Sequence, residues 1–203
     1  EGRRVGTASM LLGGLTLLLG DDAGYLTRAF VAVDPSAPSP DGQRLVVAAT
    51  GKVSEDPLVS ITTSVRDRCI AVVDAAGRVG ITNTISDKWV VPMTRVANGP
   101  LLTATIAPKV DAFATLSAAG GVERYSLEKG FPEASFKSLF GMVQYEGLLK
   151  PEHVYQASTG EDTAEVKFGL VPLIQGTLKA TVFAMIFAVP LAVLAAVYTS
   201  EFL

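Results

Sequence analysis

The sequence predicts a mainly β protein with propeller-like antiparallel repeats, about three blades of an incomplete propeller, followed by a linker and one C-terminal transmembrane α-helix. Three observations predict it: a repeat in the first 130 residues, glycine turns between strand-like runs, and an apolar run at the end of the chain. We expect a β-repeat domain over residues 1–130, a linker with a short amphipathic helix over 131–169, and the membrane helix over 170–203.

The repeat becomes visible when the sequence is displaced against itself. With a displacement of 43 residues, Val59–Thr63 aligns with Leu102–Ile106, and Cys69–Val79 aligns with Ala112–Val122, without a gap. A third copy, Leu17–Leu26, needs a displacement of 53 because a proline-rich loop lengthens the first repeat. Alternating and β-branched residues in these segments indicate strands.

Glycines mark the same turn in each repeat. Gly24, Gly77 and Gly120 lie where a hairpin needs a positive φ, which glycine adopts without steric cost. A period near 40–45 residues with about four strands per unit is typical of β-propeller blades. The WD and kelch signatures are absent, so a plain antiparallel sandwich with similar hairpins is the alternative. Three blades do not close a ring, which predicts further blades upstream and exposed strand edges.

The pattern changes between Gly130 and Lys167. Apolar residues there predict a short amphipathic helix with Pro132 near its start; they are Phe131, Phe136, Leu139, Phe140, Met142, Val143 and Tyr145. Aromatic residues ahead of a membrane span often lie at the membrane interface. This segment therefore rests either at that interface or as a cap on the last blade, and the sequence leaves both open.

The C-terminal run predicts a membrane span. Between Ala180 and Tyr198 only Thr181 has a clearly polar side chain, and these 19 residues give about 28 Å of helix, close to the hydrocarbon thickness of a bilayer. No polar stripe follows the helix, as it would on a surface helix of a soluble protein. The alternative is a helix buried in a large soluble core. Pro172 suits the first turn.

Small residues recur at every fourth position of this run. They are Gly176, Ala180, Ala184, Ala188, Ala192 and Ala196. In lipid such a ridge permits the close approach of another helix, although an alanine-rich composition alone would also produce it. Pro190 leaves the carbonyl of Ile186 without its usual donor and predicts a kink that neighbouring helices would cover. Both features predict packing against partner helices.

Composition excludes several classes of function. A net charge of −3 and a pI near 5.2 do not suit nucleic-acid binding. Cys69 is the only cysteine, so no internal disulfide forms, and His153 is the only histidine, so a histidine-rich zinc site is excluded. We therefore expect no catalytic residues, no metal, no cofactor and no enzyme activity. A start at Glu1 and an end directly after the span predict a fragment of a longer chain.

The C-terminal third resembles a known family. Gly169–Thr181, the Pro190-Leu-Ala break and the ending Tyr198-Thr-Ser-Glu-Phe-Leu resemble the phosphate ABC transporter permease, at the start of the permease core of its C-type inner-membrane subunit. Ser138–Gly147 and Lys150–Ser158 resemble the enlarged form, which carries a propeller-like extracytoplasmic insert.

That resemblance implies a part of an ATP-driven phosphate importer. Its partners would be a second permease subunit, cytoplasmic ATPase subunits and a periplasmic phosphate-binding protein. It would lie in the bacterial inner membrane, with the repeat domain on the periplasmic side and residues 170–203 as the first helix of the permease core. The cytoplasmic coupling loop of the family is absent from this sequence. The rival hypothesis is a membrane-anchored β-propeller binding or sensor module without transport activity.

Overall fold

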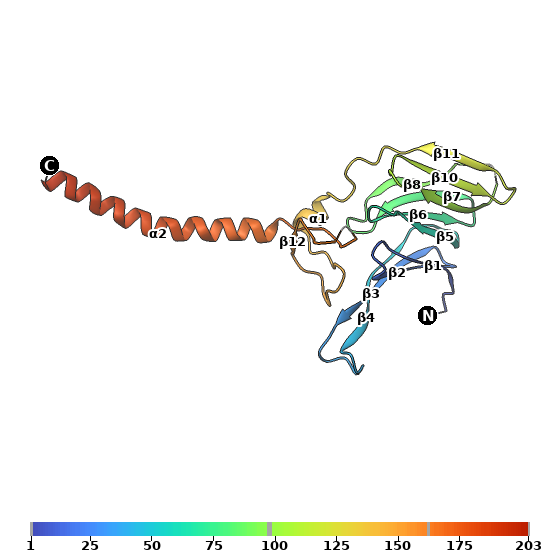
Figure 1. Ribbon diagram of the computed structural model, residues 1–203, viewed down its shortest axis with the longest axis horizontal. Helices are drawn as coiled ribbons and strands as arrows, with labels where there is room; N and C mark the ends of the chain where they lie inside the picture. The colour runs from blue at the N-terminus through green and yellow to red at the C-terminus, as the bar shows by residue number, and fades with distance from the viewer. Residues whose placement is uncertain (1, 97–98, 162, 203) are drawn as a thin grey trace.

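The computed structural model describes residues 2–96, 99–161 and 163–202. Within these ranges the protein is mainly β. Three antiparallel sheets lie side by side, a short capping segment follows them, and one long helix extends away from the body (Figure 1).

Each sheet is an antiparallel meander in which strands adjacent in sequence pair with one another. Sheet 1 contains β1 (Val5–Met10), β2 (Thr16–Asp21), β3 (Tyr25–Val33) and β4 (Gln43–Lys52). Sheet 2 contains β5 (Leu58–Thr63), β6 (Cys69–Asp74), β7 (Arg78–Asn83) and β8 (Trp89–Arg95). Sheet 3 contains β9 (Leu101–Ile106), β10 (Ala112–Ser117) and β11 (Val122–Ser126).

The first strands of the three sheets lie next to one another. β5 contacts both β1 and β9. The hydroxyls of Ser60 and Thr103 join β5 to β9 at 2.9 Å, and the Thr63 hydroxyl donates to the carbonyl of Met10 at 3.3 Å. Blades of a propeller meet in this way, through their innermost strands. The arrangement is therefore propeller-like, with about three blades in the described residues.

Sheet 2 is the middle layer, and its strand β6 is buried on both faces. Ile70 and Val72 pack toward sheet 1, in a cluster with Leu18 and Leu58. The alternate residues of β6, among them Val73, pack toward sheet 3. Because successive side chains of a strand point to opposite faces, the continuous apolar run of β6 supplies both layers of the core.

The structure shows that the sequence repeats are the three sheets. β1 and β2 map onto β5 and β6 with the displacement of 53, and β5 and β6 map onto β9 and β10 with that of 43. One backbone hydrogen bond recurs in all three copies. It joins Asp22 N to Arg4 O, Ala75 N to Pro57 O, and Ala118 N to Pro100 O, at 3.0, 2.8 and 2.9 Å.

The three turn glycines have φ values of +79°, +76° and +83° at Gly24, Gly77 and Gly120. Their surroundings differ. A Cβ added to Gly24 would lie 2.1 Å from the Ser54 carbonyl oxygen, and one added to Gly77 would lie 2.4 Å from that of Gly99, whereas one at Gly120 would meet nothing within 4 Å. The first two turns are thus packed against the chain that leads into the following sheet.

The segment after sheet 3 covers one end of sheet 2. Its helix α1 (Phe136–Phe140) has only five residues and is shorter than the apolar pattern predicts. It ends because Gly141 is extended, with no room for a side chain beside the Lys137 carbonyl. Val143 and Tyr145 therefore lie outside the helix and pack on Ile85. The two short strands β12 (Tyr155–Gln156) and β13 (Lys167–Phe168) then pair.

Buried polar contacts fix this segment to the sheets. Arg68 donates two hydrogen bonds to the carboxylate of Glu146, at 2.7 and 3.1 Å, and a third to the Thr163 carbonyl at 2.8 Å. The Thr16 hydroxyl also donates to Glu146, at 2.5 Å. Through these contacts the described part of residues 131–169 packs against sheets 1 and 2.

The helix α2 (Val171–Phe202) has 32 residues, and none of them is buried. Its most apolar stretch has a mean hydropathy of 2.5, so it is long and apolar enough to cross a membrane. The Thr181 hydroxyl donates to the Thr177 carbonyl at 2.9 Å and is thereby satisfied within the helix. Pro190 lies inside α2, and the helix axis changes direction in its C-terminal half (Figure 1).

Candidate ligand-binding cleft and membrane helix

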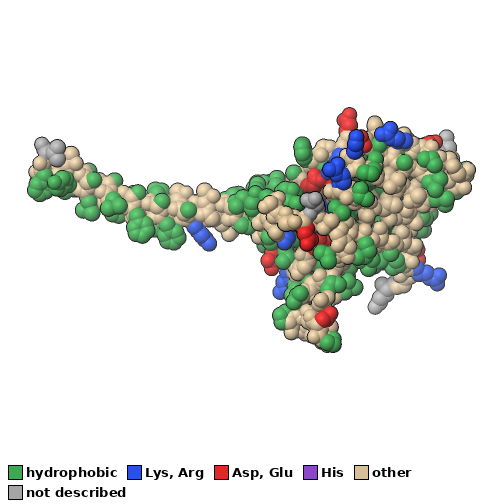
Figure 2. Space-filling view, in the orientation of Figure 1, with side chains coloured by type: hydrophobic (Ala, Val, Ile, Leu, Met, Phe, Trp, Pro, Cys, Tyr) green, Lys and Arg blue, Asp and Glu red, His purple; other side chains and the backbone are tan. Residues whose placement is uncertain are grey.

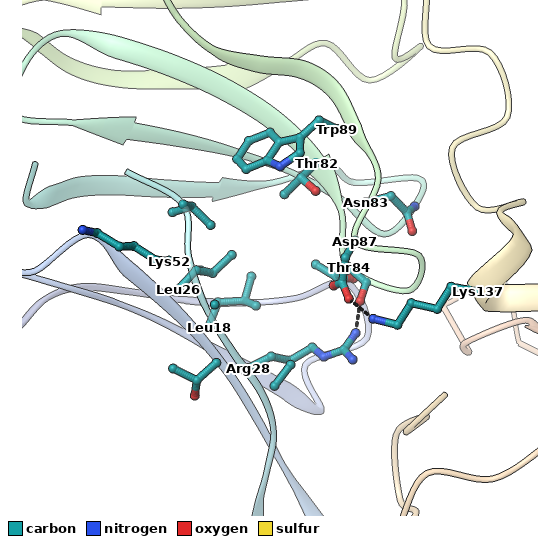
Figure 3. A pocket seen from close by; sticks show the side chains of 14 residues that line it. Leu18, Leu26, Arg28, Lys52, Thr82, Asn83, Thr84, Asp87, Trp89 and Lys137 are labelled. Carbon is teal, nitrogen blue, oxygen red and sulfur yellow. Dashed lines mark hydrogen bonds and ion pairs between the residues drawn. The ribbon is translucent and has the colours of Figure 1, made fainter. Parts of the chain in front are cut away.

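A cleft of about 400 Å³ lies between sheets 1 and 2, beside α1 (Figure 3). Strands β2 and β3 provide one wall, the end of β4 provides the rim, and β7 with the loop that follows it provides the other wall. The lining residues are Leu18, Leu26, Arg28, Ala49, Thr50, Gly51, Lys52, Val53, Thr82, Asn83, Thr84, Asp87, Trp89 and Lys137.

The two ends of the cleft differ in polarity. Leu18 and Leu26 lie together in the part of the cleft nearer Lys52, and Trp89 lies across from them on the other wall (Figure 3). The opposite end brings together Arg28, Thr84, Asp87 and Lys137 (Figure 3). A ligand that fills the cleft would therefore meet apolar surface at one end and hydrogen-bond donors at the other.

Arg28 is the central polar residue of the cleft. It lies on β3, opposite Ala49 of β4, and reaches across to sheet 2, where its Nη1 donates to the Thr84 carbonyl. Its Nε is buried and has no hydrogen-bond partner among the described residues. A buried donor without a partner is costly, and because this nitrogen has almost no accessible surface, a ligand would reach it only if the side chain moved.

The lysines of the cleft are paired, unlike Arg28. Lys137 of α1 contacts the Asp87 carboxylate at 2.5 Å, and Lys52 contacts Glu55. The hydrogen bond that Lys52 donates to Glu55 raises the pKa of Lys52. Among the described residues, three cationic side chains line the cleft, and Arg28 is the one that forms no ion pair with a carboxylate. Its charge also acts on the buried Glu165 carboxylate.

The residues singled out in the sequence lie elsewhere. The small-residue ridge is on α2, where all six positions are exposed: Gly176, Ala180, Ala184, Ala188, Ala192 and Ala196. Gly24, Gly77 and Gly120 lie in the turns β2–β3, β6–β7 and β10–β11, and they do not line the cleft. None of them therefore meets Arg28, and the ridge and the cleft are separate features.

Sequence reasoning missed Arg28 because no motif surrounds it. Its partner Thr84 is 56 residues away, in the turn that follows β7. The available signal is an arginine in the middle of an alternating strand, where a hydrophobic or small polar residue is usual. A second missed feature is the Asp that begins each of the first two turns. Asp21 and Asp74 each accept two backbone N–H groups of their own turn, at 2.8–3.1 Å.

No protein-family profile matches the sequence, and no curated protein matches it. Among the solved structures that the chain resembles is the β-propeller domain of Cps50 (Swd1) from Myceliophteria thermophila, with a TM-score of 0.49 and 13% sequence identity. The match covers 61% of this chain and 38% of that one. The class defined here is a β-propeller-like domain with a C-terminal apolar helix that could span a membrane.

Proposed function

We propose that this chain is a membrane-anchored β-propeller-like module that binds a small ligand in the cleft between sheets 1 and 2. The anchoring rests on one observation above all. α2 is 32 residues long and strongly apolar, and no part of it is covered by the β domain. In water such a helix would expose apolar side chains over its whole length, and a bilayer is the environment that buries them without any other part of this protein.

The ligand we propose carries an anionic group next to a small apolar part. Arg28 would hold the anion, because it lines the cleft and no carboxylate forms an ion pair with it among the described residues. Leu26 and Trp89 would contact the apolar part. Phosphate esters and carboxylates share this chemistry.

Membrane anchoring is tested by alkaline extraction of membranes from cells that express the full chain. Wild-type protein should stay in the pellet. Replacing Ile186 and Val193 by Lys should release it, since a lysine at the centre of a span costs about 2.5–3.5 kcal/mol on insertion scales. Val122→Lys, on the exposed β11, is the control and should behave as wild type. Wild-type protein in the soluble fraction would refute the anchor.

Ligand binding is tested with inorganic phosphate, phenyl phosphate and benzoate. Trp89, the single tryptophan, lines the cleft and provides a fluorescence signal. At least one probe should change this signal saturably, and Arg28→Gln should weaken its binding about tenfold or more, as expected for the loss of one charge-assisted hydrogen bond. Arg124→Gln, on the exposed β11, is the matched control. Equal affinity of wild type and Arg28→Gln would refute the site.

A second candidate function follows from the ridge of α2. A lone anchor has no use for Ala184 and Ala188 on one ridge or for Pro190 within the span, whereas both suit a helix covered by other helices. In this proposal α2 belongs to the permease of a phosphate importer in the bacterial inner membrane. The β domain would lie on the periplasmic side. A second permease subunit, ATPase subunits and a phosphate-binding protein would be its partners.

The permease proposal is tested in the full-length parent protein. Replacing Ala184 and Ala188 together by Leu should reduce the amount of complex that is purified with the partner subunits. Leucines at Val182 and Val189, on the other side of the helix, should leave that amount unchanged. A normal yield from the alanine double variant would count against this function and would leave the anchored module as the better proposal.

A further inference from the structure

Exposed apolar side chains gather where α2 leaves the body of the protein (Figure 2). Three of them belong to α1 or follow it directly: Phe136, Phe140 and Met142 are exposed by 81%, 40% and 60%. Large apolar side chains grouped on a surface mark a site that another apolar phase covers. We call these three residues the α1 patch.

The α1 patch is held in a fixed conformation. The rings of Phe136 and Phe140 pack together, with centroids 5.0 Å apart. Ser135 caps the helix by accepting from the Ser138 backbone N–H, and the Ser138 hydroxyl accepts from the Ser135 N–H in return. Lys137 forms an ion pair with Asp87, in the loop between β7 and β8. The aromatic rings are therefore displayed by a capped and tethered turn.

The patch also has a fixed place relative to α2. The Leu170 N–H donates to the carbonyl of Leu139 in α1, at 2.7 Å, one residue before α2 begins. With 32 residues α2 is about 48 Å long, whereas a hydrocarbon core is about 30 Å thick and a whole bilayer about 40–45 Å. When the helix is centred, about 9 Å extends beyond the core on each side. The first turn of α2 thus passes through the headgroup layer, and α1, which is bonded to the residue before α2, lies at the outer edge of that layer.

We propose that the α1 patch is a membrane contact that lies in the headgroup layer on the side where α2 begins. This inference rests on the proposed anchoring function. The occupant is lipid because the patch continues into the exposed apolar first turn of α2, where Leu173 and Ile174 are also uncovered. Apolar side chains such as Phe, when they lie on one face of a helix at a membrane surface, bury at the boundary between headgroups and acyl chains. The contact would fix the orientation of the β domain against the bilayer.

The test uses a polarity-sensitive fluorophore attached to single cysteines in the full chain, reconstituted in phosphatidylcholine vesicles. The native Cys69 is fully buried, so it does not compete for the label. The test positions are Phe136→Cys and, as a second variant, Met142→Cys. Phe187→Cys, in the middle of α2, reports insertion of the helix, and Val122→Cys, exposed on β11 far from α2, reports the aqueous phase.

The proposal expects labels at 136 and 142 to show blue-shifted emission and to be quenched most strongly by lipids with a nitroxide near the headgroup. The label at 187 should be quenched by deep nitroxides, and the label at 122 by neither. If the label at 187 is quenched by deep nitroxides while the labels at 136 and 142 behave like the label at 122, the patch does not touch lipid. The membrane contact is then wrong, and the anchoring function remains supported. If 187 also behaves like 122, both the anchor and the membrane contact are wrong.

Discussion

Replacing Gly24 by Ala tests how the repeats are joined. The new Cβ would lie 2.1 Å from the Ser54 carbonyl oxygen, so the chain that leads into β5 must move. That movement breaks the hydrogen bonds from Val53 N and Ser54 N to the Gly24 carbonyl, now 2.9 and 3.2 Å, each worth about 1 kcal/mol. The left-handed φ of +79° adds about 1–2 kcal/mol for a residue with a Cβ. We expect a total loss of about 3–4 kcal/mol.

Gly120→Ala is the matched control. Its φ of +83° imposes the same backbone cost, but its Cβ would meet nothing within 4 Å. Urea unfolding of the full chain in detergent, followed by Trp89 fluorescence and by circular dichroism, gives the free energy of unfolding of each variant. The Gly24 variant should be less stable than the Gly120 variant by about 2 kcal/mol. Equal losses would refute the idea that the turn packs against the next repeat.

Three further predictions concern buried groups. Arg68→Met should lower the free energy of unfolding by about 3–5 kcal/mol, because it leaves Glu146 buried and unpaired, and adding Glu146→Leu should recover most of that loss in the same urea assay; no recovery would contradict the pairing. Burial raises the pKa of Glu165 above 4.5, so the native state holds its proton more tightly than the unfolded chain. Relative to Glu165→Gln, wild-type stability should therefore fall as the pH rises from 4.5 through the native pKa, and parallel pH profiles would argue against this. Burial also raises the pKa of the Cys69 thiol to about 12, so a chromogenic disulfide should leave it unmodified at about pH 8 until urea unfolds the chain.

The repeat and the helix could be predicted from the sequence because the residue patterns that indicate them are local. The displacement of 43 aligns strand with strand, since each copy places its apolar residues and its turn glycine at the same spacing. The apolar run of α2 fixes its own secondary structure, and Val171–Pro172 starts the helix as predicted. Each of these features depends on residues within a single hairpin or a single helix.

The cleft and the contacts that hold the cap could not be predicted, because they depend on residues far apart in the sequence. Arg28 lines the cleft only because the fold places β3 of sheet 1 beside Thr84. Arg68 likewise contacts Glu146, which is 78 residues away in the sequence. The short helix predicted in this segment is present, but apolar spacing continues past Gly141, where the backbone is extended and the helix has ended. Tyr145 therefore packs in the core of the cap, with Ile85 and Val143, and does not lie on a helix face.

The junction between β13 and α2 has a mechanical consequence. Only Gly169 and Leu170 separate the strand from the helix, and both backbone N–H groups are bonded to the body, to the carbonyls of Val154 and Leu139 at 2.9 and 2.7 Å. The helix is therefore joined to the β domain without a flexible linker. A change in bilayer thickness that tilts the helix would incline the β domain with it, and the opening between sheets 1 and 2 would turn toward or away from the lipid surface.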